Sequence, residues 1–190
     1  MTGMTFESPR LETERLILRP LTLSDVPTIQ YEFGRWSIIQ YMTTSTPWPY
    51  PPNGAHFWFT ENVLKRYADK SEAVWAITKK HMPAVLIGVI SIREDSGDGN
   101  RGFWMSESEQ GKGYMTEAVT AVNDWVFQHT VLDELIVKNV ASNHASRRVK
   151  EKTGATLVQT IVEDYHNGDS ESEVWRLRKE DWLRFRNQQS

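Results

Sequence analysis

Two glycines that stand two positions apart, Gly111 and Gly113, form a stretch whose spacing suggests chemistry. An apolar and aromatic run at 101–105 precedes them, and a segment with helical periodicity, 116–128, follows them. We therefore expect the glycines on a turn between a strand and a helix. At such a turn the first N–H groups of the helix lack partners, and the helix dipole places partial positive charge at this end. Such a turn can bind phosphate, because glycine lets the backbone approach an anion closely.

The spacing of these glycines excludes two common phosphate-binding motifs. The dinucleotide fingerprint needs a third glycine three residues after Gly113, where this chain has Thr116. A P-loop needs Gly-Lys-Ser/Thr at a fixed spacing, and none follows here. A glycine-bearing turn without a ligand is the alternative interpretation of an isolated pair.

The same stretch resembles the pyrophosphate loop of the GNAT N-acetyltransferases, which is written Q/R-x-x-G-x-G/A. The matching residues are, in order, Gln110, Gly111, Lys112, Gly113, Tyr114 and Met115. Met115 departs from the small residue of the general pattern. The branch that contains the ribosomal-protein N-terminal acetyltransferases, the RimJ/RimL-like branch, tolerates larger residues at this position.

Further motifs resemble the same branch in the same order, so the resemblance extends from Leu11 to Trp182. They are the opening at 11–20, the asparagine element at 143–155 and the ending at 175–182. The asparagine element departs from the family at two positions. Ala155 stands where phenylalanine is usual, and Lys150 stands where many members carry a tyrosine.

The resemblance implies acetyl-CoA as donor and an amine as acceptor, either a peptide N-terminus or a small molecule. The implied cofactor-binding residues are Trp104, Met105, Ser106, Gln110, Gly111, Lys112, Gly113, Tyr114, Met115, Asn143 and Ser146. In this arrangement the loop amides hold the pyrophosphate, and the pantetheine arm pairs with the strand before the loop. Asn143 would bond the arm from the other side.

Acetyl transfer requires two proton transfers and a donor for the oxyanion. For the base, the resemblance offers Asp164, shortly before an Asn-Gly turn, with Glu107 as the second candidate. For the acid that helps the CoA thiolate leave, the branch suggests Ser146, because position 150 is not tyrosine. A backbone N–H of the strand can stabilise the oxyanion. The alternatives are solvated surface acids for the two carboxylates and a helix-cap hydroxyl for Ser146.

Composition excludes several other classes of function. The chain has 190 residues, 39% hydrophobic and 25% charged, which predicts one domain over 1–190. A net charge of -3 gives no basic field for nucleic acid, and no apolar run reaches the roughly 20 residues of a membrane helix. With no cysteine and five scattered histidines, we expect no metal site. We expect a cytoplasmic protein, as a monomer or homodimer.

The elements that must position these residues predict an α+β fold (α/β three-layer). The resemblance implies a mixed, mostly antiparallel sheet of about 6–7 strands, flanked by helices and splayed between its fourth and fifth strands. Strands are predicted at 16–20, 74–78, 84–92, 101–105, 135–140, 157–162 and 172–177, and helices at 24–33, 55–67, 116–128 and 145–152.

Several details of this arrangement can be predicted. A turn cluster at 95–100 predicts an antiparallel meander, and the strand–helix–strand order from 101 to 140 predicts locally parallel pairing. Gly88 within a strand predicts a bulge or a close contact. The proline-rich segment 46–52 predicts a stiff loop that presents Trp48 and Tyr50 to the core or to a substrate.

Two functions of different classes fit these observations. The first is an acetyl-CoA-dependent N-acetyltransferase in which the amine attacks directly within a ternary complex. The second is a GNAT-fold module that binds CoA without transfer and acts as a sensor or scaffold. Lys150 and Ala155 leave the second open, and release of free thiol with a set of amines separates the two.

Overall fold

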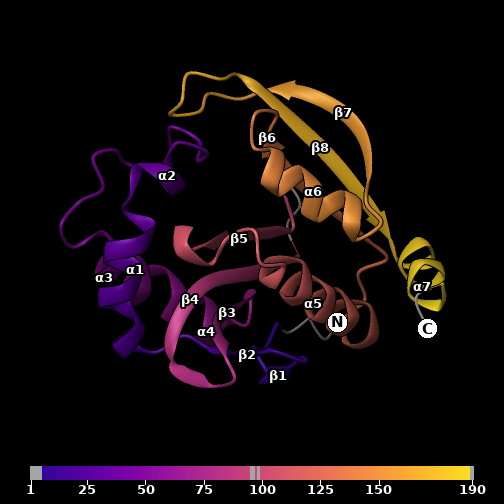
Figure 1. Cartoon of the computed structure of the whole chain (residues 1–190), viewed down its shortest axis with the longest axis horizontal. Coiled ribbons are helices and arrows are strands. Elements are labelled where there is room, and N and C mark those ends of the chain that lie inside the picture. The colour runs from indigo at the N-terminus through magenta and orange to yellow at the C-terminus, as the bar shows by residue number, and fades with distance from the viewer. Residues whose placement is uncertain (1–5, 95–96, 98, 189–190) are drawn as a thin grey trace.

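Two antiparallel sheets carry the strands of this chain (Figure 1). The computed structural model describes residues 6–94, 97 and 99–188. The first sheet contains, in spatial order, β1 (Leu11–Glu12), β2 (Leu16–Pro20), β3 (Glu72–Lys79), β4 (Met82–Arg93) and β5 (Arg101–Met105). The second contains β6 (Glu134–Val140), β8 (Glu171–Arg178) and β7 (Thr156–Val162), with β8 in the middle.

Helices cover the sheets, and the predicted α+β fold is confirmed. The described α-helices are α1 (Val26–Phe33), α2 (Trp36–Ile39), α3 (Gly54–Phe57), α4 (Leu64–Asp69), α5 (Tyr114–His129), α6 (His144–Lys152) and α7 (Lys179–Asn187). A π-helical stretch, η2 (Trp58–Val63), joins α3 to α4, so the helix predicted at 55–67 is continuous. None of the described helices is long and apolar enough to cross a membrane.

The central strand β3 is buried on both faces and separates two cores. Ala73, Trp75 and Ile77 pack into the core that contains α5, whereas Val74 and Ala76 pack into the core that contains α1 and α3. This division follows from the alternation of side chains along a strand. The first sheet is therefore the middle layer of three, as predicted.

The two sheets part between β5 and β6. Asn100, just before β5, holds Ile136 of β6: its N–H donates to the Ile136 carbonyl and its Oδ1 accepts the Ile136 N–H, each at 2.7 Å. Beyond this point β5 pairs with β4, and β6 pairs with β8. The predicted parallel pairing is therefore wrong for the described residues, because the strands diverge after Asn100. The predicted splay is confirmed.

Gly88 lies at a bulge in β4, as predicted. Ile77 is paired with Gly88 and Thr78 with Leu86, so one residue of β4 is extra. A Cβ on Gly88 would lie 2.6 Å from the Trp104 carbonyl oxygen, too close for any side chain. Glycine here lets β5 approach β4 directly before the splay.

The proline-rich loop presents its two aromatic residues in different ways. Tyr50 is partly buried and packs edge-on against Phe33, with ring centroids 5.3 Å apart. Trp48 stays exposed and lies 5.1 Å from the ring of Trp36. Of the turn predicted at 95–100, only 97, 99 and 100 belong to the described residues, and the rest of that prediction lies outside them.

A buried ion pair anchors the start of α1 and predicts a pH-dependent stability. Arg19 donates two hydrogen bonds of 2.8 Å to Asp25, which is 2% exposed. Burial opposes ionisation of Asp25, but hydrogen bonds from Arg19 and Thr22 outweigh it and lower its pKa. The folded pKa is thus below the unfolded one, so the stabilisation is present above about pH 4 and is lost as the pH falls through the folded pKa.

We expect Asp25→Ala to lower the free energy of unfolding by roughly 3 kcal/mol at pH 7, since it leaves Arg19 largely buried without its partner. Urea unfolding at pH 7 and pH 3 measures this, and the difference between the variant and the wild type should shrink at pH 3. The double variant with Arg19→Met is the control and should recover part of the loss. Equal stability of Asp25→Ala and wild type at pH 7 would contradict the prediction.

Candidate active site

The open edge of β5 forms one wall of the candidate site. The Ser106 N–H donates to the Ile87 carbonyl of β4 at 2.8 Å. Because backbone groups alternate along a strand, the N–H and C=O of Met105 point the other way, toward the splay. Gln110 uses its side-chain amide to donate to the Met105 carbonyl at 2.9 Å. The predicted residues Met105 and Gln110 are thus brought together, and Trp104, Met105 and Ser106 are all buried.

The glycine loop lies between β5 and α5, as predicted, and both glycines need the left-handed backbone conformation. The φ angles are +75° at Gly111 and +82° at Gly113, a region that favours glycine. Gly113 is the N-cap of α5, so the unpaired N–H groups of Tyr114 and Met115 open this helix. No atom lies within 4 Å of the place where a Cβ of Gly111 would be. The loop therefore offers an accessible backbone at the positive end of a 16-residue helix.

Arg15 fixes this helix start, and sequence reasoning missed its role. Its guanidinium bonds Glu117 at 2.7 Å, donates to the Lys112 carbonyl at 3.1 Å and lies over the ring of Tyr114. Thr13 also donates to Glu117. Burial opposes ionisation of Glu117, but the hydrogen bonds from Thr13 and Arg15 lower its pKa. The opening motif and the glycine loop, about 100 residues apart in sequence, are thus one unit.

The loop is tied to the first sheet through Glu109. Lys79 of β3 bonds Glu109 at 2.7 Å, and Lys112 bonds it at 3.0 Å. Burial of Glu109 raises its pKa, but these hydrogen bonds and charges outweigh that effect and lower it. The predicted loop residue Lys112 is therefore engaged with a carboxylate and still half exposed.

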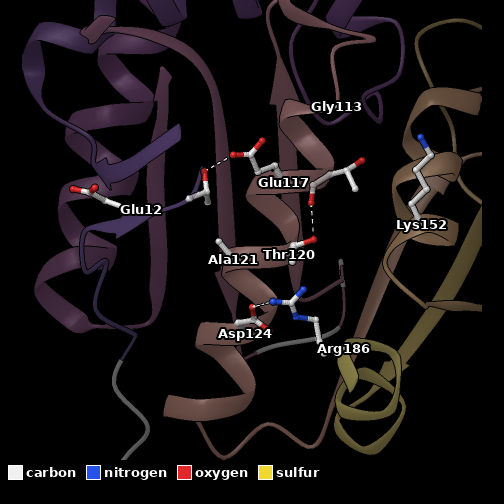
Figure 2. A pocket seen from close by; sticks show the side chains of 10 residues that line it. Glu12, Gly113, Glu117, Thr120, Ala121, Asp124, Lys152 and Arg186 are labelled. Carbon is white, nitrogen blue, oxygen red and sulfur yellow. Dashed lines mark hydrogen bonds and ion pairs between the residues drawn. The ribbon is translucent and has the colours of Figure 1, made fainter. Parts of the chain in front are cut away.

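A groove of about 500 Å³ runs from the glycine loop along the exposed face of α5 (Figure 2). Its lining residues are Glu12, Thr13, Gly113, Thr116, Glu117, Thr120, Ala121, Asp124, Lys152 and Arg186. Figure 2 shows Lys152 and Arg186 on the side of the groove opposite Glu12. Arg186 forms an ion pair of 3.2 Å with Asp124. The groove thus begins at the glycine loop and is lined by both acidic and basic side chains.

The second wall of the candidate site is α6, which lies beside α5 (Figure 1). Asn143 is its N-cap, and the Asn143 Oδ1 accepts the backbone N–H of Ser146 at 3.0 Å. The alternative role of Ser146 as a capping hydroxyl is therefore wrong. The Ser146 hydroxyl instead accepts a hydrogen bond of 2.8 Å from Lys150, one turn further along the helix.

Lys150 is the unexpected residue of this wall. It is 1% exposed, and among the described residues it has no carboxylate within ion-pair distance. Its Nζ lies 5.5 Å from the ring centre of Phe103 on β5. Burial lowers its pKa well below the usual value, and the charge of Arg101 lowers it further. Sequence reasoning noted only that Lys150 replaces a tyrosine; its position on the buried side of α6, with Ser146 and Val149, was the available signal.

A second cation, Arg101, is buried near the first. It is 6% exposed, donates to the Asn123 side chain at 2.8 Å, and has an Nε atom that is buried without a partner. Burial lowers its pKa to about 10. Arg101 and Lys150 both contact the ring of Phe103, at 6.0 and 5.5 Å. Two buried cations therefore lie near the ring of Phe103, and no acid among the described residues forms an ion pair with either.

The two candidate base residues lie on different elements and both are exposed. Glu107 follows β5 in the short helix η3 (Glu107–Glu109), and its carboxylate lies 3.6 Å from Arg35. Asp164 lies in the β7–β8 loop, and its backbone carbonyl accepts the Thr44 N–H at 2.9 Å. Figure 1 shows this loop reaching across to α2.

Further hydrogen bonds hold the β7–β8 loop in place. The His166 ring N–H donates to the Thr46 carbonyl at 2.6 Å, and the Asn167 N–H donates to the Gln40 carbonyl at 3.1 Å. This loop is therefore a fixed bridge between the second sheet and the segment after α2. Among the described residues, no cluster of His, Cys, Asp and Glu could hold a metal ion.

A family model described as the acetyltransferase (GNAT) domain matches residues 15–156. The chain belongs to this family. The match includes the glycine loop, both walls of the splay and the opening residue Arg15, so the resemblance to GNAT enzymes is confirmed. A search of curated protein sequences found no match.

Solved GNAT-like structures share the fold of this chain. RimL, a ribosomal L7/L12 α-N-protein acetyltransferase in complex with coenzyme A, is 19% identical, with a TM-score of 0.74 over 90% of this chain and 98% of its own. Spermidine N-acetyltransferase from Vibrio cholerae, in complex with CoA and spermine, is 17% identical, with a TM-score of 0.73 over 90% and 99%. An acetyltransferase from Agrobacterium tumefaciens is 25% identical, with a TM-score of 0.70 over 94% and 99%.

Proposed function

We propose that this chain transfers an acetyl group from acetyl-CoA to a primary amine within a ternary complex. The observation that carries the proposal is the junction of β5 and α5. There an open strand edge at Met105 is followed, after the short helix η3, by a left-handed glycine turn that starts a long helix. These features suit the two ends of CoA, a pantetheine arm that pairs with a strand and a pyrophosphate that binds helix N–H groups.

The backbone of this chain would make most of the contacts with acetyl-CoA. The amides of Gly111, Gly113, Tyr114 and Met115 would hold the pyrophosphate, and the groove along α5 has room for the nucleotide, with Lys152 as a cation beside it. The Met105 N–H, which points into the splay, would donate to the developing oxyanion. Asn143 is engaged in capping α6, so its contribution to the pantetheine arm would come from its remaining amide N–H groups.

The proton transfers would be divided between the two sides of the splay. Asp164 would take or relay the proton of the acceptor amine, with Glu107 as the second candidate, and Ser146 would assist the thiolate. Both carboxylates are exposed, so they can also attract a cationic amine. Since the chain has no cysteine, no thiol can form an acyl-enzyme, which supports direct attack by the amine.

The acceptor belongs to one of two chemical classes. A lysine-like amine has a pKa near 10.4 and needs a base, whereas a peptide N-terminus has a pKa near 7.7–8.0 and needs less help. The RimJ/RimL-like motifs favour a peptide N-terminus, and a polyamine is the small-molecule alternative. We propose that residues 1–190 act as one domain in this reaction.

Release of free thiol from acetyl-CoA, followed with a set of peptide N-termini, polyamines and amino acids, tests this function. Calorimetry with CoA, done in parallel, measures donor binding separately. Turnover with at least one amine supports the proposal. Tight CoA binding without turnover for any amine would support a CoA-binding sensor or scaffold instead, and absence of CoA binding would contradict both.

A further inference from the structure

The buried lysine of α6 serves no purpose in the folding of this protein that its contacts reveal. An ammonium group that leaves water costs several kcal/mol unless an acid compensates it, and no acid among the described residues pairs with Lys150. With 1% of its surface exposed, it does not reach solvent with its charged end, as lysines on protein surfaces do. A leucine or methionine at this place would pack with less cost. A buried ionisable group of this kind is a feature of functional sites.

Among the described residues, the hydrogen bond of Lys150 to Ser146 shows how Lys150 can act. Its Nζ donates to the Ser146 hydroxyl oxygen at 2.8 Å. A hydroxyl that accepts a hydrogen bond through its oxygen keeps its own proton free to donate elsewhere. The backbone of Ser146 is fixed as well, because Asn143 accepts its N–H. Because Lys150 donates to the hydroxyl oxygen and Asn143 fixes the backbone, the Ser146 O–H points away from Lys150.

We propose that Lys150, acting through the Ser146 hydroxyl, supplies the proton that the departing CoA thiolate takes up. This inference rests on the proposed acetyl transfer and names a positioning residue for it. When the C–S bond breaks, sulfur keeps the electron pair and takes the Ser146 hydroxyl proton. A proton of the Lys150 ammonium moves to the Ser146 oxygen, which leaves Lys150 as a neutral amine. Water restores that proton after the products leave, and the proton of the acceptor amine leaves separately to the base.

The charges around Lys150 set the pH at which this relay stops. From β5, Arg101 and the ring of Phe103 face it, and the described buried side chains of α5 carry no charge. In the second sheet, the buried Glu173 is held by Arg147 and Asn139. The relay needs the ammonium form, so kcat should fall as the pH rises through the lowered pKa of Lys150. The wild type should show this basic limb at a pH below the usual range of lysine.

Lys150→Met tests the relay, since methionine keeps the length of the side chain and removes the amine. General acid–base help is typically worth ~10²–10⁴-fold. A thiolate leaves more readily than an alkoxide, so we expect a loss of about 10-fold to 100-fold in kcat, with little change in the KM for acetyl-CoA. The basic limb should disappear. Lys65→Met, which removes an exposed lysine of α4, is the matched control and should behave as wild type.

Stability gives a readout that separates this role from a structural one. Because Lys150→Met removes a buried charge without an acid, its free energy of unfolding should rise while its activity falls. The folded pKa of Lys150 is lowered, so the wild type should gain stability as the pH rises from that pKa toward the unfolded value near 10.4. The advantage of the variant should therefore be largest at low pH. A variant that loses both stability and activity would contradict the relay.

A double-mutant cycle with Ser146→Ala tests the connection between the two residues. If Lys150 acts through Ser146, Lys150→Met should slow Ser146→Ala no further, and Ser146→Ala alone should already lack the basic limb. Losses in kcat that multiply would show independent roles and overturn the relay. If the wild type acetylates no amine, the proposed acetyl transfer itself is overturned, independently of the relay. CoA calorimetry then shows whether the chain still binds the donor.

Discussion

Asp164→Asn should lower the rate of acetyl transfer by ~10²–10⁴-fold, the usual range for general-base help, while the fold is kept. Asparagine keeps the size of the side chain, and the loop is held by contacts that the change leaves intact. These are the Thr44 N–H on the Asp164 carbonyl and the His166 ring on the Thr46 carbonyl. Steady-state rates with saturating acetyl-CoA measure this effect.

Two further variants make this prediction specific. Asp69→Asn, at the exposed end of α4, is the matched control and should leave the rate unchanged. Glu107→Gln tests the second candidate, whose carboxylate lies near Arg35. If Asp164→Asn keeps its rate and Glu107→Gln does not, the base is Glu107. If both stay active, no carboxylate is needed, and an acceptor of low pKa that gives its proton to water becomes the better hypothesis.

Gly113→Val should weaken acetyl-CoA binding by at least about tenfold, which corresponds to 1.4 kcal/mol. The φ of +82° places this residue in the left-handed region, which costs an L-residue roughly 1–2 kcal/mol and a β-branched one more. A Cβ would also lie 3.3 Å from Arg15, the residue that fixes the helix start. The loop must then give up the conformation that presents its N–H groups. Calorimetry with CoA measures the change.

Gly154→Ala is the control for backbone strain at a distance from the loop. Its φ is +78°, so the substitution imposes a similar conformational cost at the end of α6. This variant should lose stability and keep its affinity for CoA. If a folded Gly113→Val protein binds CoA with unchanged affinity, the loop does not bind the pyrophosphate.

The local elements of this protein can be predicted from sequence because their signals are local. The apolar and aromatic run at 101–105 predicts β5 to the residue, and Asn143 predicts the start of α6 through its capping side chain. The glycine turn before α5 is likewise predicted, since left-handed positions select glycine. The family motifs then identify the acetyltransferase fold, because they include the backbone positions that glycine alone can occupy.

The tertiary structure alone decides what these elements bring together. Arg15 meets the start of α5 across about 100 residues, and no periodicity or composition signals such a contact. Parallel pairing of β5 with β6 was expected from chain order, yet Asn100 holds only their beginning and the strands diverge. The burial of Lys150 against Phe103, with Ser146 as its partner, depends on packing between α6 and β5. Sequence determines which backbone conformations are favourable, whereas burial and charge at the site arise from contacts between distant segments, which only the folded chain defines.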